Sequence, residues 1–231
     1  MKKFDNEVAA LEKRLCEMGD LSRAMVGLAA IAVKDPSEDV HERVQEQERR
    51  LDQMQTDIDE DAIRMLTVYG PVAKDLRYVL VCTHITSQLE RIGDQVVNVI
   101  QALELLPDTR EPSDLSDKLN RMADLACEMV DDALDAYFAR NAEKATRTRR
   151  RDDLVDAMNA QVMQDMLTED VLQQVLSGAS TIGPAVAHIL IACYLERIAD
   201  QATNICKQVI YMERGSDVRH IRPEPNGDAT S

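Results

Sequence analysis

Ten residues, LERIGDQVVN at positions 89–98, recur as LERIADQATN at positions 195–204. Seven of the ten residues are identical, and the two copies are offset by 106 positions. A match of this length at a fixed offset indicates an internal repeat. We therefore expect two copies of one helical unit rather than a single large bundle.

The repeat extends upstream of these ten residues. Glu48 and Asp52 precede the first copy, and Asp152 and Asp156 lie 104 positions further along the chain, before the second copy. The matched region in each half therefore covers two helices. A third helix in each half is expected from the apolar residues that recur at three- and four-residue spacing, as between Val8 and Leu28.

The composition favours an all-α fold. The chain has only 8 Gly, 7 Pro and 2 Phe and no Trp among 231 residues, as is typical of helical proteins with aliphatic cores. We predict two tandem pseudo-symmetric three-helix bundles, over residues 1–107 and 113–213, with a flexible tail at 214–231. The expected helices end at punctuating residues such as Gly70-Pro71 and the proline-bearing linker 107–113. Their predicted ranges include 36–69, 72–106, 114–140, 142–167 and 184–213.

Charge and hydropathy exclude several classes of function. The formal charge of −15, from 42 acidic and 27 basic residues, disfavours binding to nucleic acid or to an anionic membrane. The longest apolar run, residues 24–33, is far shorter than the roughly 20 residues of a membrane span. The N-terminus has no apolar stretch of the signal-peptide type, so we expect a cytoplasmic protein without direct membrane insertion.

Acidic residues form pairs four positions apart on the expected helices, two pairs in each half. Residues at this spacing share one helix face, about 5–6 Å apart, so facing pairs would bring four carboxylates together. Four like charges repel unless they are protonated or joined by a cation, and oxygen-rich sites suit Mg, Mn, Ca or iron. The ordinary alternative is a solvated face on which Arg91 and Arg197 form surface ion pairs. The pairs are Glu48 and Asp52, Glu90 and Asp94, Asp152 and Asp156, and Glu196 and Asp200, and Asn98 and Asn204 continue two of the stripes as possible additional ligands.

The doubled ERIxD motif, at 90–94 and 196–200, and PVAKDLR at 71–77 resemble the signature segments of the PhoU family. The resemblance covers about residues 5–213. It implies two pseudo-symmetric three-helix bundles whose (E/D)xxxD pairs hold metal ions, with Mg, Mn, Fe and Zn all known in the family. The family's motif positions carry over to Glu48, Asp52, Glu90, Asp94, Asp152, Asp156, Glu196 and Asp200.

The resemblance also implies a function and partners. It implies a negative regulator of phosphate uptake and of the phosphate-starvation response. The regulator would act through the ATPase subunit of the phosphate ABC transporter and through a PhoR-type sensor histidine kinase. We expect a homodimer without catalytic residues, and Arg77 is a possible part of a partner surface, although an ion pair is the more ordinary explanation for it. The DLR segment has no second copy, and Gln55 stands where some relatives have an acid, so equal metal occupancy of the two halves is open.

Two rival hypotheses remain from the sequence. A carboxylate-bridged dimetal enzyme in a helical bundle would usually carry Glu-x-x-His ligand motifs, which this chain lacks. A metal-free helical adaptor would use the same bundles without cations. Elemental analysis of the protein separates the metal-free adaptor from the metal-binding hypotheses.

Overall fold

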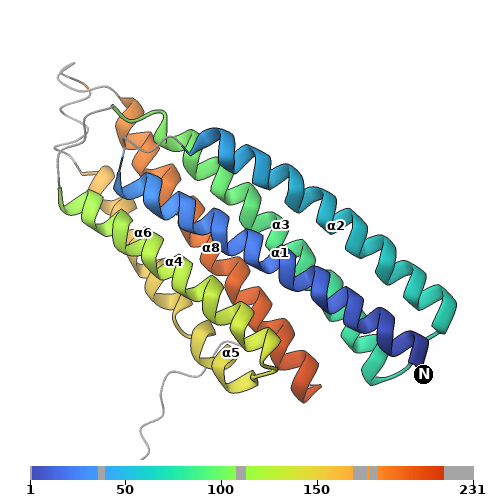
Figure 1. The fold of residues 1–231 in the computed structure, drawn as a ribbon. Helices are drawn as coiled ribbons and strands as arrows, with labels where there is room; N and C mark the ends of the chain where they lie inside the picture. Colours follow the sequence, from blue (N-terminus) through green and yellow to red (C-terminus); the bar gives the residue numbers. More distant parts are fainter. Residues whose placement is uncertain (1, 36–39, 108–112, 169–175, 177–181, 216–231) are drawn as a thin grey trace, which may run out of the picture.

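The computed structural model describes residues 2–35, 40–107, 113–168, 176 and 182–215. Within these ranges the regular structure is α-helical and contains no strand, so the predicted all-α class is confirmed. The long helices lie side by side in an elongated bundle (Figure 1). They are α1 (Lys2–Lys34), α2 (His41–Tyr69), α3 (Lys74–Leu103), α4 (Asp114–Phe138), α5 (Ala142–Arg149), α6 (Asp152–Met166) and α8 (Ile182–Arg214).

The helices form two tandem units, as the repeat predicts, with three described helices in the first and four in the second, because the expected middle helix of the second unit is divided into α5 and α6. In the first unit α1, α2 and α3 all pack against one another, and in the second α8 packs against α4, α5 and α6. The two units meet mainly where α3 packs on α8, so the two copies of the repeated motif lie on neighbouring helices. Most of the predicted linker, and the tail from residue 216 onward, lie outside the described residues.

Two predicted helix ends are confirmed and have clear local causes. α2 ends at Tyr69 because Gly70 adopts a left-handed conformation with φ of 52°, and its N–H donates to the carbonyl of Leu66. α4 begins at Asp114, after Ser113, whose hydroxyl accepts from the backbone N–H of Ser116 in a capping box.

The predicted continuous helix over 142–167 is wrong, because the structure breaks it into α5 and α6. At the break the N–H groups of Arg150 and Arg151 donate to carbonyls three residues earlier, those of Arg147 and Thr148. This tighter turn ends α5 and starts a new helix at Asp152. The break therefore places a candidate metal ligand in the first turn of α6.

The first unit has a close approach between α2 and α3 at Gly93. A Cβ atom at this position would lie 2.7 Å from Cδ1 of Leu51 and 3.6 Å from Cε of Met25. Leu51 and Met25 are fully buried, so α1, α2 and α3 converge tightly at this level of the bundle. Asp52 directly follows Leu51, and Asp94 directly follows Gly93. The tight packing therefore holds these two acidic residues on helices that cannot move apart freely.

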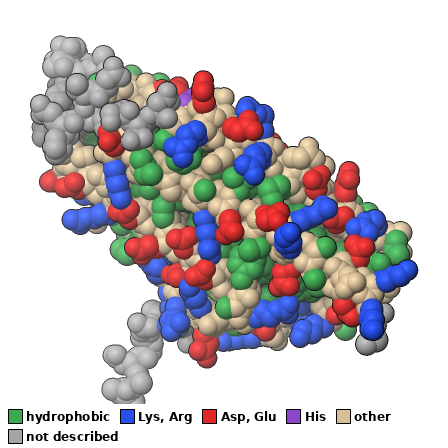
Figure 2. All heavy atoms as spheres, viewed as in Figure 1, with side chains coloured by type: hydrophobic (Ala, Val, Ile, Leu, Met, Phe, Trp, Pro, Cys, Tyr) green, Lys and Arg blue, Asp and Glu red, His purple; other side chains and the backbone are tan. Residues whose placement is uncertain are grey.

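One described helix, α8, is long and apolar enough to cross a membrane by length and composition, which the count of consecutive apolar residues did not predict. This helix packs against α3, α4, α5 and α6. A core helix passes the same test, so the finding is weak evidence for a span. On the face drawn in Figure 2, acidic and basic side chains are interspersed rather than gathered into a single basic field.

Candidate metal centres

The first candidate centre lies between α2 and α3. α2 carries Glu48 and Asp52, and α3 carries Glu90 and Asp94. Burial raises the pKa of Glu48, and the negative charges of Asp52 and then Asp94 raise it further. Burial likewise raises the pKa of Glu90, which is also raised by Asp94, Asp52 and Glu48. The two pairs therefore face each other closely enough for every member to repel Glu90.

The second candidate centre lies between α6 and α8. Burial raises the pKa of Asp152 to about 6, and the charges of Asp200 and Asp156 act in the same direction. Burial also raises the pKa of Glu196, with further contributions from Asp200, Asp156 and Asp152. All four carboxylates of this half are thus coupled electrostatically across the two helices, as in the first half.

The donor set of each centre fits a hard cation, because it consists of carboxylate oxygens with an asparagine nearby. Within the described ranges, however, no three His, Cys, Asp or Glu side chains converge closely enough to hold a metal ion as they stand. Carboxylates repel one another, and without a cation between them they stay apart. To hold a metal ion, the carboxylates of a centre would have to turn toward one another from the arrangement in this structure.

The repeat places one glutamine next to a candidate ligand in each centre. Gln95 and Gln201 directly follow Asp94 and Asp200 at equivalent positions. In each glutamine the Oε1 atom is shielded from solvent and accepts no hydrogen bond within the described structure. Sequence reasoning used these residues only as part of the repeat, although their identity in both copies was a usable signal.

The second centre contains two groups that the first lacks. Thr203 lies beside Asp152 and partly offsets the rise in the pKa of that carboxyl. Lys207 is half-buried on α8, and its Nζ donates to Oδ1 of Asn204 at 3.0 Å. Sequence reasoning missed Lys207 because the comparison of the two copies stopped at Asn204, and it passed over Thr203 because that position differs between the copies, with Val97 in the first.

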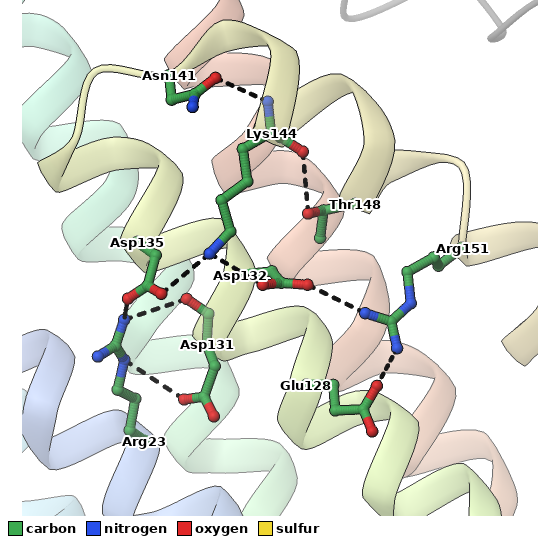
Figure 3. A network of polar contacts seen from close by, with 9 residues as sticks. All are labelled: Arg23, Glu128, Asp131, Asp132, Asp135, Asn141, Lys144, Thr148 and Arg151. Atoms are coloured by element: carbon green, nitrogen blue, oxygen red, sulfur yellow. Dashed lines mark hydrogen bonds and ion pairs between the residues drawn. The ribbon is translucent and has the colours of Figure 1, made fainter.

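Spacing alone does not make a metal centre, as Glu128 and Asp132 on α4 demonstrate. They have the same i, i+4 spacing as the candidate pairs, yet both accept hydrogen bonds from the guanidinium of Arg151 (Figure 3). Lys144 adds a second cation at 3.0 Å from Asp132. This pair already has its counter-ions, whereas the carboxylates of the first centre have no ion pair within hydrogen-bonding distance in the described structure.

The same network shows how a compensated carboxylate behaves. Asp135 on α4 accepts from Lys144 at 2.9 Å and also from Arg23 on α1 (Figure 3). The hydrogen bond from Lys144 and the contacts with Arg23 lower the pKa of Asp135, despite its partial burial. The pKa values of Glu90, Asp94, Glu196 and Asp200 shift in the opposite direction, which marks these groups as acids without sufficient positive charge.

Arg77 lies where α3 packs on the end of α8. Its guanidinium carbon is 5.3 Å from the centre of the Tyr211 ring, a cation–π contact that the sequence did not indicate. This contact gives Arg77 a role in joining the two units. Its place on a partner surface stays a prediction.

The fold and the two centres define a class of protein: a duplicated helical bundle in which two acidic pairs face each other between α2 and α3, and again between α6 and α8. The family model described as the PhoU domain matches the chain twice, over residues 15–103 and 119–209. The chain belongs to the PhoU family. The family resemblance seen in the sequence is thereby confirmed.

Similar proteins match over nearly the whole chain. A phosphate-specific transport system accessory protein PhoU homolog of Rhizobium meliloti is 30% identical over 230 residues, covering 100% of this chain and 95% of that protein. The phosphate-specific transport system accessory protein PhoU of Escherichia coli K12 is 28% identical, covering 94% of this chain and 88% of its own.

Solved structures agree with the fold. The crystal structure of PhoU from Pseudomonas aeruginosa has a TM-score of 0.84 and 28% identity, and covers 92% of this chain and 100% of that one. The phosphate transport system regulatory protein PhoU from Streptococcus pneumoniae has a TM-score of 0.81 and 25% identity, with 93% and 99% covered.

Proposed function

We propose that this protein is a cytoplasmic, metal-binding accessory protein of a phosphate-specific transport system. It would act as a negative regulator of phosphate uptake and of the phosphate-starvation response. Its partners would be the ATPase subunit of the phosphate ABC transporter and a PhoR-type sensor histidine kinase, and it would act as a homodimer. It would regulate these partners by contact and not by catalysis.

The observation that carries the regulatory role is the match of both repeats to one family over nearly the full chain, with relatives named as accessory proteins of phosphate-specific transport. The match spans both halves of the chain, so this protein shares both repeats with its relatives and not just one domain. The net charge of −15 is consistent with recognition of proteins rather than of nucleic acid.

The observation that supports metal binding is the direction of the pKa values at the two centres. The carboxyls of Glu48, Glu90 and Asp94 in the first centre all have raised pKa values, because they are partly buried beside like charges. A bound Mg, Mn, Fe or Zn ion would supply the positive charge that these groups lack. The carboxylates would then hold α2 and α3, or α6 and α8, at a fixed separation.

A genetic experiment tests the regulatory role. The gene is deleted in its host, and a reporter of the phosphate-starvation response is measured at high phosphate. We expect the reporter to be derepressed in the deletion strain and repressed again when the gene is restored. Repression that is unchanged by the deletion would contradict the proposed role.

An elemental analysis tests the metal centres. The full chain is purified without an affinity tag or chelator, and its metal content is compared with that of a Glu90→Gln, Asp94→Asn double variant. The matched control is Glu128→Gln, Asp132→Asn, which alters an acidic pair of equal spacing that Arg151 already neutralises. We expect the first variant to lose metal and the control to retain it. Metal-free wild-type protein would refute the metal centres and leave the regulatory role standing.

A further inference from the structure

The two centres differ at one charged position that the repeat aligns. Lys207 on α8 stands 106 positions after Gln101 on α3, which is the offset between the two copies of the motif. Lys207 is half-buried, whereas Gln101 is exposed. Lys207 follows Asp200 by seven residues and Asn204 by three, so all three lie on one face of α8.

The Lys207 ammonium contacts a candidate ligand of the second centre directly. Its Nζ donates to Oδ1 of Asn204 at 3.0 Å, which occupies the oxygen that a metal ion would use. The same positive charge counteracts the rise in the pKa of Asp152 on α6 and of Asp200 on α8. Lys207 therefore acts across the gap between the two helices, on carboxylates from both sides of the centre.

Among the described residues, no cation donates to a candidate ligand of the first centre as Lys207 does in the second. Arg49 and Arg91 act to lower the pKa of Glu48 and Glu90, but each is an exposed side chain next in sequence to the acid it affects. The second centre has its own such neighbour in Arg197, next to Glu196. Arg91 and Arg197 occupy equivalent positions in the two copies, whereas Arg49 aligns with Asp153, and its guanidinium pairs with Glu46 at 2.6 Å. Among these cations Lys207 is the one that donates a hydrogen bond to a candidate ligand.

We infer that Lys207 is a built-in counter-ion of the second centre, which competes with a metal ion for Asp152, Asp200 and Asn204. The first centre, between α2 and α3, is then the tighter metal site. This inference rests on the proposed metal binding and adds which half binds first. A metal ion entering the second centre must displace the ammonium from Asn204 or bind beside a like charge, and either costs affinity.

Titration of the metal-stripped full-length protein with Mn²⁺ tests the inference, with free Mn²⁺ followed by electron paramagnetic resonance. For the wild-type chain we expect one tighter and one weaker class of site. Lys207→Gln, which installs the residue of the first repeat, should tighten the weaker class by about ten- to hundred-fold, the range of effects for groups around a metal site. Lys207→Arg keeps the charge and should leave the two classes unequal.

The reciprocal variant Gln101→Lys introduces the cation into the first repeat at an exposed position, where it does not disturb the core. It should weaken the tighter class. Glu90→Gln with Asp94→Asn should remove the tighter class, and Asp152→Asn with Asp200→Asn should remove the weaker one. These double variants assign each class to one half of the chain.

The possible failures are distinguishable. Two classes of equal affinity in the wild type, or a Lys207→Gln variant with unchanged affinities, would overturn the inference while metal binding stands. Loss of the tighter class in Asp152→Asn, Asp200→Asn would reverse the assignment and also overturn it. No Mn²⁺ binding by the wild type or by any variant would overturn the proposed metal binding, and the inference with it.

Discussion

Replacing Asp152 by Asn should stabilise the metal-free protein near neutral pH, although most substitutions of partly buried residues destabilise. Burial, together with the charge of Asp200, raises the pKa of Asp152 from 3.8 to about 6. The folded state therefore binds a proton at this site more tightly than the unfolded state does. The associated stability is present in full below about pH 4 and is lost as the pH rises through about 6.

The magnitude follows from the same values. Moving a pKa from 3.8 to about 6 corresponds to roughly 3 kcal/mol of destabilisation above pH 6. Partial exposure to solvent reduces this figure, and Asn also loses the favourable interaction of a carboxylate with the first turn of α6, about 0.3–1 kcal/mol. We expect Asp152→Asn to raise the free energy of unfolding by about 1–2 kcal/mol at pH 7.5.

Urea unfolding in the presence of a chelator, followed by circular dichroism from pH 4 to 8, measures this effect. The gain from Asp152→Asn should shrink as the pH falls through 6 and vanish near pH 4. Asp153→Asn is the matched control, because Asp153 is exposed in the same helical turn. A variant that destabilises the protein equally at pH 4 and pH 7.5 would refute the reasoning, since the carboxylate charge would then carry no penalty.

Two further predictions concern packing. Gly93→Ala should lower the free energy of unfolding by up to about 2 kcal/mol in urea, because crowding against Leu51 outweighs the gain of about 1 kcal/mol in helix propensity; a more stable variant would contradict the close approach of α2 and α3. Tyr137→Phe should cost about 1 kcal/mol in the same assay, because the buried hydroxyl bridges Cys82 and Tyr78 at 3.3 and 3.4 Å; an unchanged midpoint would show that these contacts contribute nothing.

Local sequence signals predicted the repeat and several helix ends because their causes lie within a few residues. Gly70 ends α2 through its own left-handed backbone, and Ser113 caps α4 through its own hydroxyl. The pairing of Glu90 and Asp94 on one face follows from helix geometry alone. Such features need no knowledge of the other helices.

The features that the sequence did not reveal depend on contacts between helices. The break before α6 occurs among arginines with good helix propensity, and Arg151 at the break reaches across to Asp132 and Glu128 on α4. The contact with Arg151 distinguishes the neutralised pair Glu128 and Asp132 from the candidate metal-binding pairs, which have the same four-residue spacing. Only the fold places the guanidinium there, so no motif could have distinguished the two.

Under the proposed metal binding, the duplicated architecture would let two centres share a geometry and differ in affinity. Core positions of the motif are conserved between the copies, as with Ile92 and Ile198, both fully buried, and these positions set the helix packing. The position at the end of the stripe differs, with Gln101 in one copy and Lys207 in the other. Because the core residues fix the distance between the helices, a change at the end of the stripe alters charge without altering the frame. A measurement of total metal content would then average two unlike sites, and only variants that remove one centre at a time would separate their contributions.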